Sequence, residues 1–126
     1  MEIPNKLKYT RDHEWVLVNA DEVICGITEF AQRELGDIVY VDIDTIGDSL
    51  EKENIFGTIE AVKTVSDLFM PISGTIKEQN QDLIDNPQLI NESPYEKGWI
   101  IKIKDPNFTE IKELLSADEY KKEIGI

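Results

Sequence analysis

The sequence predicts a mainly β fold, a flattened barrel or sandwich of short strands with short helices and a helical C-terminal segment. Short runs of alternating apolar and polar residues recur between residues 15 and 104, separated by Gly, Pro, Asn and Asp, as is typical of half-buried strands. A Gly-Thr-Ile triplet occurs at residues 57–59 and again at residues 74–76, one on each side of Lys63. This weak internal repeat suggests a pseudo-symmetric barrel with the lysine at one end. The length of 126 residues fits a single domain spanning residues 1–126.

The first two strands are expected to pair as a hairpin that leads into a helix. Residues 15–18 and 22–25 are short apolar runs, and Asn19-Ala20-Asp21 between them supplies turn residues. Thr28 is a suitable N-cap for a short helix, and Gly36 is a suitable stop. The apolar residues of this predicted helix are Phe30, Ala31 and Leu35.

Five further strands are expected between residues 38 and 104. Gly47-Asp48 marks the turn after the first of them. Residues 80–90, interrupted by Pro87, are predicted to form a loop with helical turns. Gly57 and Gly74 would allow strands to pack closely or to kink. The predicted strands are residues 38–43, 55–62, 67–70, 74–79 and 99–104.

The C-terminal residues show a helical rather than a strand pattern. Ser116 and Glu119 form a capping-box signature for a last helix, which would carry Tyr120 and Ile124 inward. We therefore expect residues 107–126 to form a helical cover on the β core. The apolar residues that recur at helical spacing before this helix are Phe108, Ile111, Leu114 and Leu115.

The composition excludes several functions. The 26 acidic and 13 basic residues give a net charge of −13, which argues against nucleic acid and anionic membranes as partners and suits steering toward basic protein surfaces. A single cysteine, Cys25, and a single histidine, His13, provide no disulfide, no metal-binding set and no catalytic set. We expect Cys25 to be a core residue, His13 to have a structural or partner-contact role, and Trp15 and Trp99 to pack in the core. The sequence therefore predicts a protein without catalytic or metal-ligating residues.

Lys63 is the candidate functional residue. It lies between Val62 and Thr64, in the turn that joins the predicted strands 55–62 and 67–70. A lysine at the tip of a tight hairpin presents its amine to solvent, as a lysine that another enzyme modifies must do. Lysine amines are the attachment points of two swinging-arm cofactors, lipoate and biotin, so the position indicates a carrier protein.

A series of short motifs, in one order and spacing, covers nearly the whole chain and resembles the H proteins of the glycine cleavage system. Each motif alone is common, but their combination is specific. The motifs are Leu7-Lys8-Tyr9-Thr10, His13-Glu14-Trp15, Gly26-Ile27-Thr28, Ala31-Gln32, Leu35-Gly36-Asp37, Val39-Tyr40-Val41, Glu60-Ala61-Val62-Lys63, Ser66-Asp67, Pro71-Ile72-Ser73-Gly74, Asn91-Glu92-Ser93-Pro94-Tyr95 and Gly98-Trp99.

The resemblance implies a lipoyl carrier, not an enzyme, with a barrel-sandwich hybrid fold of the lipoyl/biotinyl-domain type. Lipoate would be amide-linked to Lys63, and Glu60, Ser66 and Asp67 would help present this lysine to the lipoylating enzyme. The arm would carry an aminomethyl group from glycine decarboxylase (P protein) to aminomethyltransferase (T protein), and dihydrolipoamide dehydrogenase (L protein) would reoxidise it. The protein would be a monomer in the bacterial cytoplasm, or in the mitochondrial matrix for a mature eukaryotic chain.

The resemblance also implies a cleft that shelters the loaded arm, because the carried group decomposes in water. Glu14 and Asp67 would pair with its cationic amine, and Ile27 would pack against its apolar part. Asp12 and Glu34 stand where some relatives carry Ser and His, so this cleft would be more acidic and a role for histidine there is in doubt. The alternative for Glu14 and Glu34 is that both are simply solvated.

Other carriers and binding modules are alternatives. Biotin carriers usually place methionine on both sides of the lysine, whereas Val62 and Thr64 stand here. Lipoyl domains of 2-oxoacid dehydrogenases usually show Asp-Lys-Ala and are shorter, with flexible linkers to further domains. A carrier of the same fold that donates lipoyl groups to other proteins or works in a redox partnership, and an unmodified binding module, remain open.

Overall fold

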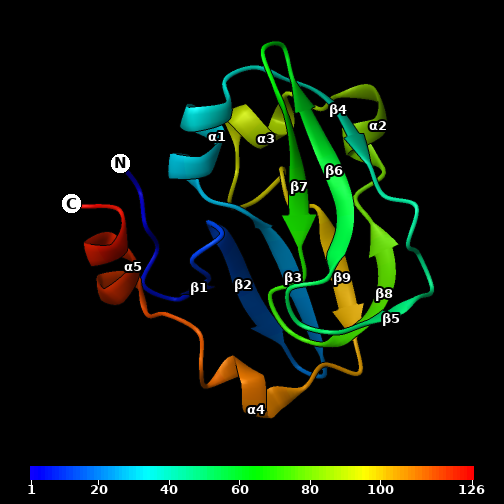
Figure 1. Ribbon diagram of the computed structural model, residues 1–126, viewed down its shortest axis with the longest axis vertical. Helices are drawn as coiled ribbons and strands as arrows, with labels where there is room; N and C mark the ends of the chain where they lie inside the picture. The colour runs from blue at the N-terminus through cyan, green and yellow to red at the C-terminus, as the bar shows by residue number, and fades with distance from the viewer.

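Two antiparallel sheets form the core of the computed structural model, which describes all residues from 1 to 126 (Figure 1). The larger sheet has the order β1-β2-β3-β9-β8-β5, and the smaller has the order β4-β6-β7. The strands are β1 (Lys8–Tyr9), β2 (Glu14–Asn19), β3 (Glu22–Ile27), β4 (Ile38–Asp42), β5 (Ser49–Leu50), β6 (Ile55–Ala61), β7 (Val65–Phe69), β8 (Gly74–Gln79) and β9 (Ile101–Lys104). The helices are α1 (Glu29–Leu35), α2 (Asp82–Asp85), α3 (Leu89–Glu92), α4 (Phe108–Ile111) and α5 (Ala117–Glu123). The predicted mainly β class is confirmed.

The predicted hairpin and first helix are present. β2 and β3 pair antiparallel over their full lengths, with Trp15 opposite Gly26. The side chain of Thr28 accepts a hydrogen bond from the Ala31 amide and caps α1, and Gly36 ends this helix with a φ of 82°. The local signals that predicted the hairpin and the helix are therefore present in the structure. β1 and β5 were not predicted, because two residues are too few to show an alternating pattern.

The main core lies between the two sheets and takes apolar side chains from both. Cys25 is 1% exposed in this core, so its expected role as a core residue is confirmed. The two Gly-Thr-Ile triplets place Ile59 on β6 of the small sheet and Ile76 on β8 of the large sheet, and both isoleucines are buried in the core. The weak repeat thus marks two strands that face the same core from opposite sheets.

Gly57 is required by a close approach between β4 and β6. A Cβ at this position would lie 2.5 Å from the backbone oxygen of Asp42 and 2.5 Å from Cδ1 of Ile43. We expect Gly57→Ala to lower the free energy of unfolding by about 1–3 kcal/mol, because the two strands must separate to admit the methyl group. Urea denaturation of the two proteins measures this difference, and an unchanged midpoint would contradict the close approach.

The strand predicted at residues 67–70 is found at Val65–Phe69, and two other predicted strands differ from the structure for physical reasons. The strand expected at residues 38–43 contains a bulge between Ile38 and Tyr40, so consecutive side chains at Val39 and Tyr40 are both exposed. The strand expected at residues 99–104 begins only at Ile101, and Ile100 just before it is buried as well. The regular alternation that predicted these strands is therefore interrupted in both.

A second, smaller core joins the N-terminal segment to the C-terminal helix. The rings of Tyr9 and Tyr120 are stacked with centroids 4.8 Å apart, and Trp15 packs in the same cluster at 1% exposure. Core packing is thus confirmed for Trp15. Trp99 packs only at the rim of this cluster, where the Lys102 ammonium lies 5.1 Å from its ring centroid.

The C-terminal segment is only partly helical before its last helix. The capping box of Ser116 and Glu119 is present, and α5 buries Tyr120 as predicted. The expected continuous helical pattern over residues 108–115 is wrong, because α4 has four residues and Leu115 pairs with Tyr9 in an isolated β-bridge. No helix of the structure has both the length and the apolar composition needed to cross a bilayer.

Candidate functional site

Lys63 lies at the tip of the β6–β7 hairpin, which projects at one end of the molecule (Figure 1). The turn closes through a 2.8 Å hydrogen bond from the Ala61 amide to the Thr64 carbonyl. The Lys63 side chain is exposed, and no ion pair of the structure includes its amine. The flanking side chains of Val62 and Val65 are also exposed, at 75% and 62%. The tip therefore presents an exposed amine with the largely exposed side chains of Val62 and Val65 beside it.

The tip is connected to the end of α1. The Val62 amide donates a 3.1 Å hydrogen bond to the Asp37 carbonyl, just after the helix. A Cβ at Gly36 would lie 3.6 Å from Cε of Lys63, so the lysine stem runs over the backbone of this glycine. The lysine consequently starts beside the helix that forms one wall of a cavity.

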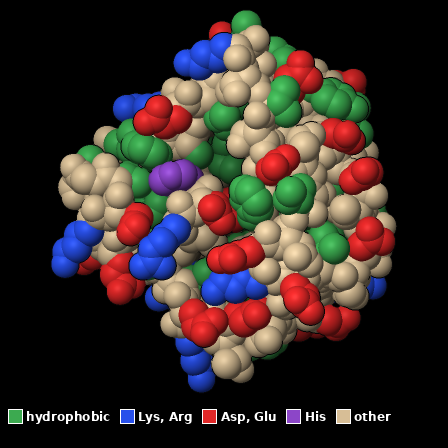
Figure 2. All heavy atoms as spheres, viewed as in Figure 1, with side chains coloured by type: hydrophobic (Ala, Val, Ile, Leu, Met, Phe, Trp, Pro, Cys, Tyr) green, Lys and Arg blue, Asp and Glu red, His purple; other side chains and the backbone are tan.

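This cavity has a volume of about 350 Å³ and lies between α1, the start of β2 and the strands β6 and β7. Six of its lining residues are hydrophobic, so part of its surface is apolar. Figure 2 shows the hollow beside the single histidine, with hydrophobic atoms inside it. The cavity is lined by Asp12, His13, Glu14, Ile27, Phe30, Ala31, Glu34, Leu35, Ile59, Ser66, Asp67 and Leu68.

Glu14 is a buried carboxylate in the wall of this cavity. Its side chain is 2% exposed at the start of β2. Its Oε2 accepts a 2.9 Å hydrogen bond from the Phe69 amide on β7, and its Oε1 accepts a 3.3 Å bond from Thr10 Oγ1. Burial raises the pKa of Glu14 well above its ordinary value, although the bond from Phe69 opposes this. The alternative that Glu14 is solvated is wrong, whereas Glu34 is exposed.

Carboxylates dominate the electrostatics of the cavity. Asp12, Glu14, Glu34 and Asp67 all line it, and His13 is the only lining residue that can carry a positive charge. Burial lowers the pKa of His13 despite the nearby acidic groups, which favours the neutral ring. The cavity would therefore attract an ammonium group and repel an anionic ligand.

His13 has contacts that indicate a structural role. Its backbone has a φ of 67°, and its ring lies 4.9 Å from the Phe30 ring, centroid to centroid. Its Nδ1 lies 2.9 Å from the Tyr120 hydroxyl, which is also 2.7 Å from Thr28 Oγ1. The C-terminal helix α5 therefore supports both the histidine and the N-cap of the cavity wall.

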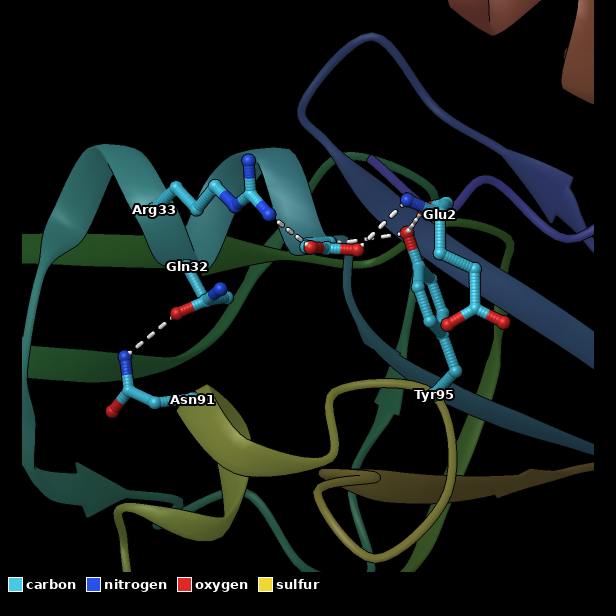
Figure 3. Close-up of polar contacts among 6 residues, drawn as sticks. Glu2, Gln32, Arg33, Asn91 and Tyr95 are labelled. Atoms are coloured by element: carbon cyan, nitrogen blue, oxygen red, sulfur yellow. Dashed lines mark hydrogen bonds and ion pairs between the residues drawn. The ribbon is translucent and has the colours of Figure 1, made fainter.

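Helix α1, the wall of the cavity, contains no fully buried residue, and polar contacts from distant segments help to hold it (Figure 3). At its N-terminal end the Glu29 amide donates a 3.0 Å hydrogen bond to the Tyr95 hydroxyl, and the Glu29 carboxylate accepts a 2.8 Å bond from the Glu2 amide. At its C-terminal end the Gly36 carbonyl accepts a 2.9 Å bond from Asn91, which donates another to the side chain of Gln32 in the middle of the helix. Segments far apart in the sequence thus fix the helix at both ends.

The structure brings most of the predicted site residues together. Ile27 and the four carboxylates line one cavity, together with Ser66. Glu60 does not line it, because it lies next to the buried Ile59 and points to the opposite face of the small sheet, where its strand partners are Tyr40 and Val65. The remaining lining residues were not predicted as part of a site. Of these, Phe30, Ala31 and Leu35 continue the helical spacing from Ile27 and could have been found, whereas Ile59 and Leu68 carry no signal beyond that of a core strand.

The comparisons with known proteins agree on one family. The family model described as Glycine cleavage H-protein matches residues 7–125. A glycine cleavage system H protein of Halalkalibacterium halodurans is 52% identical over 98% of this chain and 96% of that protein. Another of Bacteroides thetaiotaomicron is 52% identical over 96% of each chain. The crystal structure of a glycine cleavage system H protein from Mycobacterium marinum is similar with a TM-score of 0.88 and 38% identity, over 98% of this chain and all of that one.

Proposed function

This chain belongs to the glycine cleavage H-protein family, and from that premise we propose that Lys63 is its lipoyl attachment site. The protein is a carrier of the glycine cleavage system and not an enzyme. The observation that carries the proposal is the free, exposed amine of Lys63 at the β6–β7 tip, directly beside the end of α1. An amide bond to lipoate would remove one positive charge there and would break no contact of the fold.

The residues around the tip fit a lipoyl group. The floor of the neighbouring cavity is apolar and suits the hydrocarbon part of the arm, and its carboxylates suit a cationic amine at the end. When bound, the group would supply a disulfide, one sulfur of which takes up the aminomethyl unit while the S–S bond breaks and the other sulfur becomes a thiol. The chain itself supplies the lysine, the direction in which the lysine points, and a neighbouring cavity with an apolar floor.

We assign the sheltering of the carried group to Asp12, Glu14, Ile27 and Glu34, with Asp67 as a second partner for its amine. Glu14 supports this assignment most, because a buried carboxylate interacts with an ammonium more strongly than an exposed one. Exclusion of water protects a group that decomposes in water. Glu60 on the outer face, and Ser66 and Asp67 on the cavity side, would contact the lipoylating enzymes and so present Lys63 to them.

The partners that we propose are those of the glycine cleavage system and the enzymes that lipoylate it. The aminomethyl group would come from glycine decarboxylase, pass to aminomethyltransferase, and leave a reduced arm for dihydrolipoamide dehydrogenase. A tethered group meets each of these active sites at high effective concentration. The bacterial relatives make the cytoplasm the compartment that we propose.

Intact-mass spectrometry tests the attachment site directly. We expect a lipoate ligase to add one lipoyl group to the purified protein, and peptide mapping to find it on Lys63. Incubation with glycine and glycine decarboxylase should then add the mass of one aminomethyl group. A chain that gains no lipoyl mass would contradict the proposal, and a lipoylated chain that accepts nothing from glycine would indicate the lipoyl-donating alternative.

A further inference from the structure

Asn91 uses its whole side-chain amide to hold one short segment of the chain. Its Oδ1 accepts a 2.9 Å hydrogen bond from the Ile38 amide at the start of β4. Its Nδ2 donates a 2.9 Å bond to the Gly36 carbonyl and another, also of 2.9 Å, to Gln32 Oε1 on α1. Figure 3 shows this side chain reaching α1 from α3. The contacts lie on both sides of Asp37, so the amide brackets residues 36–38.

The bracketed segment is the one that contacts the lysine-bearing tip. The carbonyl of Asp37 accepts the hydrogen bond from the Val62 amide, and the stem of Lys63 runs over Gly36. The next residue, Ile38, pairs with Ala61 at the end of β6. The position of the tip relative to the cavity wall therefore depends on where residues 36–38 are held.

Asn91 itself sits on a rigid support. Its neighbour Ile90 is completely buried in the main core. The backbone beside it is tightly packed, because a Cβ at Gly98 would lie 2.8 Å from Cα of Ile90. α3 is consequently anchored in the main core through Ile90, in addition to the hydrogen bonds that Asn91 makes.

We propose that Asn91 is a positioning residue that fixes the Lys63 tip against the end of α1, so that an arm on this lysine starts at the mouth of the cavity. Its hydrogen bonds act on the lysine through the Gly36–Ile38 segment and do not touch the arm. The role in directing an arm rests on the proposed function of Lys63, whereas the fixing of the tip does not.

Amide exchange in the protein without lipoate tests the fixing of the tip. In Asn91→Ala we expect hydrogen exchange at the Val62 amide to become faster by about tenfold, because the segment that accepts its hydrogen bond is released. The amide of Ile100, which donates to Cys25 in the core, should change no more than the global stability does. Asn91→Asp keeps the acceptor for Ile38 but sets a carboxylate oxygen against the Gly36 carbonyl, so exchange at Val62 should become faster in this variant too.

Asn80 provides a matched control. It is 4% exposed and also makes three side-chain hydrogen bonds, donating to the carbonyls of Lys97 and Trp99 and accepting from the Asp82 amide. Asn80→Ala should lower stability without a selective effect on Val62. In the lipoylated protein loaded with glycine and glycine decarboxylase, we expect Asn91→Ala to shorten the lifetime of the carried group several-fold, and Asn80→Ala not to do so.

The outcomes separate this proposal from that for Lys63. The proposal would be supported if Asn91→Ala, but not Asn80→Ala, shows faster amide exchange at Val62 and a shorter lifetime of the carried group. Val62 exchange that is unchanged, or that rises equally in Asn80→Ala, would overturn the fixing of the tip. An unchanged lifetime would overturn its role in directing the arm. Failure of the wild-type protein to accept lipoate would instead count against the proposed function, and the exchange measurement would still decide the role of Asn91.

Discussion

Lys63→Arg is expected to abolish lipoylation completely and to leave the fold intact. A guanidinium cannot form the amide that attaches lipoate, so no partial modification should remain. The side chain is exposed at a hairpin tip, and the turn closes through the backbone of Ala61 and Thr64. The free energy of unfolding should therefore stay within about 0.5 kcal/mol of the wild type, as is usual for surface substitutions.

Intact mass after incubation with a lipoate ligase, together with urea denaturation, measures both parts of this prediction. Lys97→Arg is a suitable control, because Lys97 is also exposed and its amine takes part in no ion pair. This control should be lipoylated as the wild type is. A lipoyl group found on the Lys63→Arg protein would place the attachment site elsewhere, and an unfolded variant would contradict an exposed tip without supporting contacts.

The lysine tip could be predicted from the sequence because its signals are local. Two strands with turn residues between them indicate a hairpin without knowledge of the rest of the chain. The N-cap Thr28 and the capping box at Ser116 are local in the same sense, and both are present. The cavity residues, in contrast, were expected only through the resemblance to H proteins, because the cavity joins segments distant in sequence.

The contacts that hold the cavity wall could not be predicted from the sequence. Asn91 and Gly36 are 55 residues apart, and Glu29 and Tyr95 are 66 apart. Amide and phenol side chains in loops are ordinary, and no periodicity marks the ones that will meet a helix. The burial of Glu14 is also contrary to what its residue type indicates, since Glu is rarely buried without a partner. Only the fold brings the Phe69 amide to it as a donor.

We expect Glu14→Gln to shorten the lifetime of the carried group while it stabilises the folded protein at neutral pH. Glu14→Gln keeps a carbonyl oxygen for the Phe69 amide and removes the acid group that can become charged beside an ammonium. On the assignment proposed above, the ionised form of Glu14 pairs with the carried ammonium, and loss of one charge-assisted contact of about 1.5–3 kcal/mol should shorten the lifetime of the carried group by about tenfold or more. Glu34→Gln changes an exposed carboxylate of the same cavity and should have a much smaller effect. Release of the carried group from the two variants measures the difference.

The pH dependence of folding distinguishes this role from simple damage to the structure. Burial raises the pKa of Glu14 in the folded protein. Between its ordinary pKa and the raised one, the unfolded chain has lost a proton that the folded chain keeps, so wild-type stability falls as pH rises through this window. Glu14→Gln has no such titratable group, so its free energy of unfolding should increase relative to that of the wild type as pH rises through this window. If Glu14→Gln is less stable than the wild type at neutral pH, the buried side chain of Glu14 serves the fold. If the carried group lives as long in this variant as in the wild type, Glu14 does not shelter the arm.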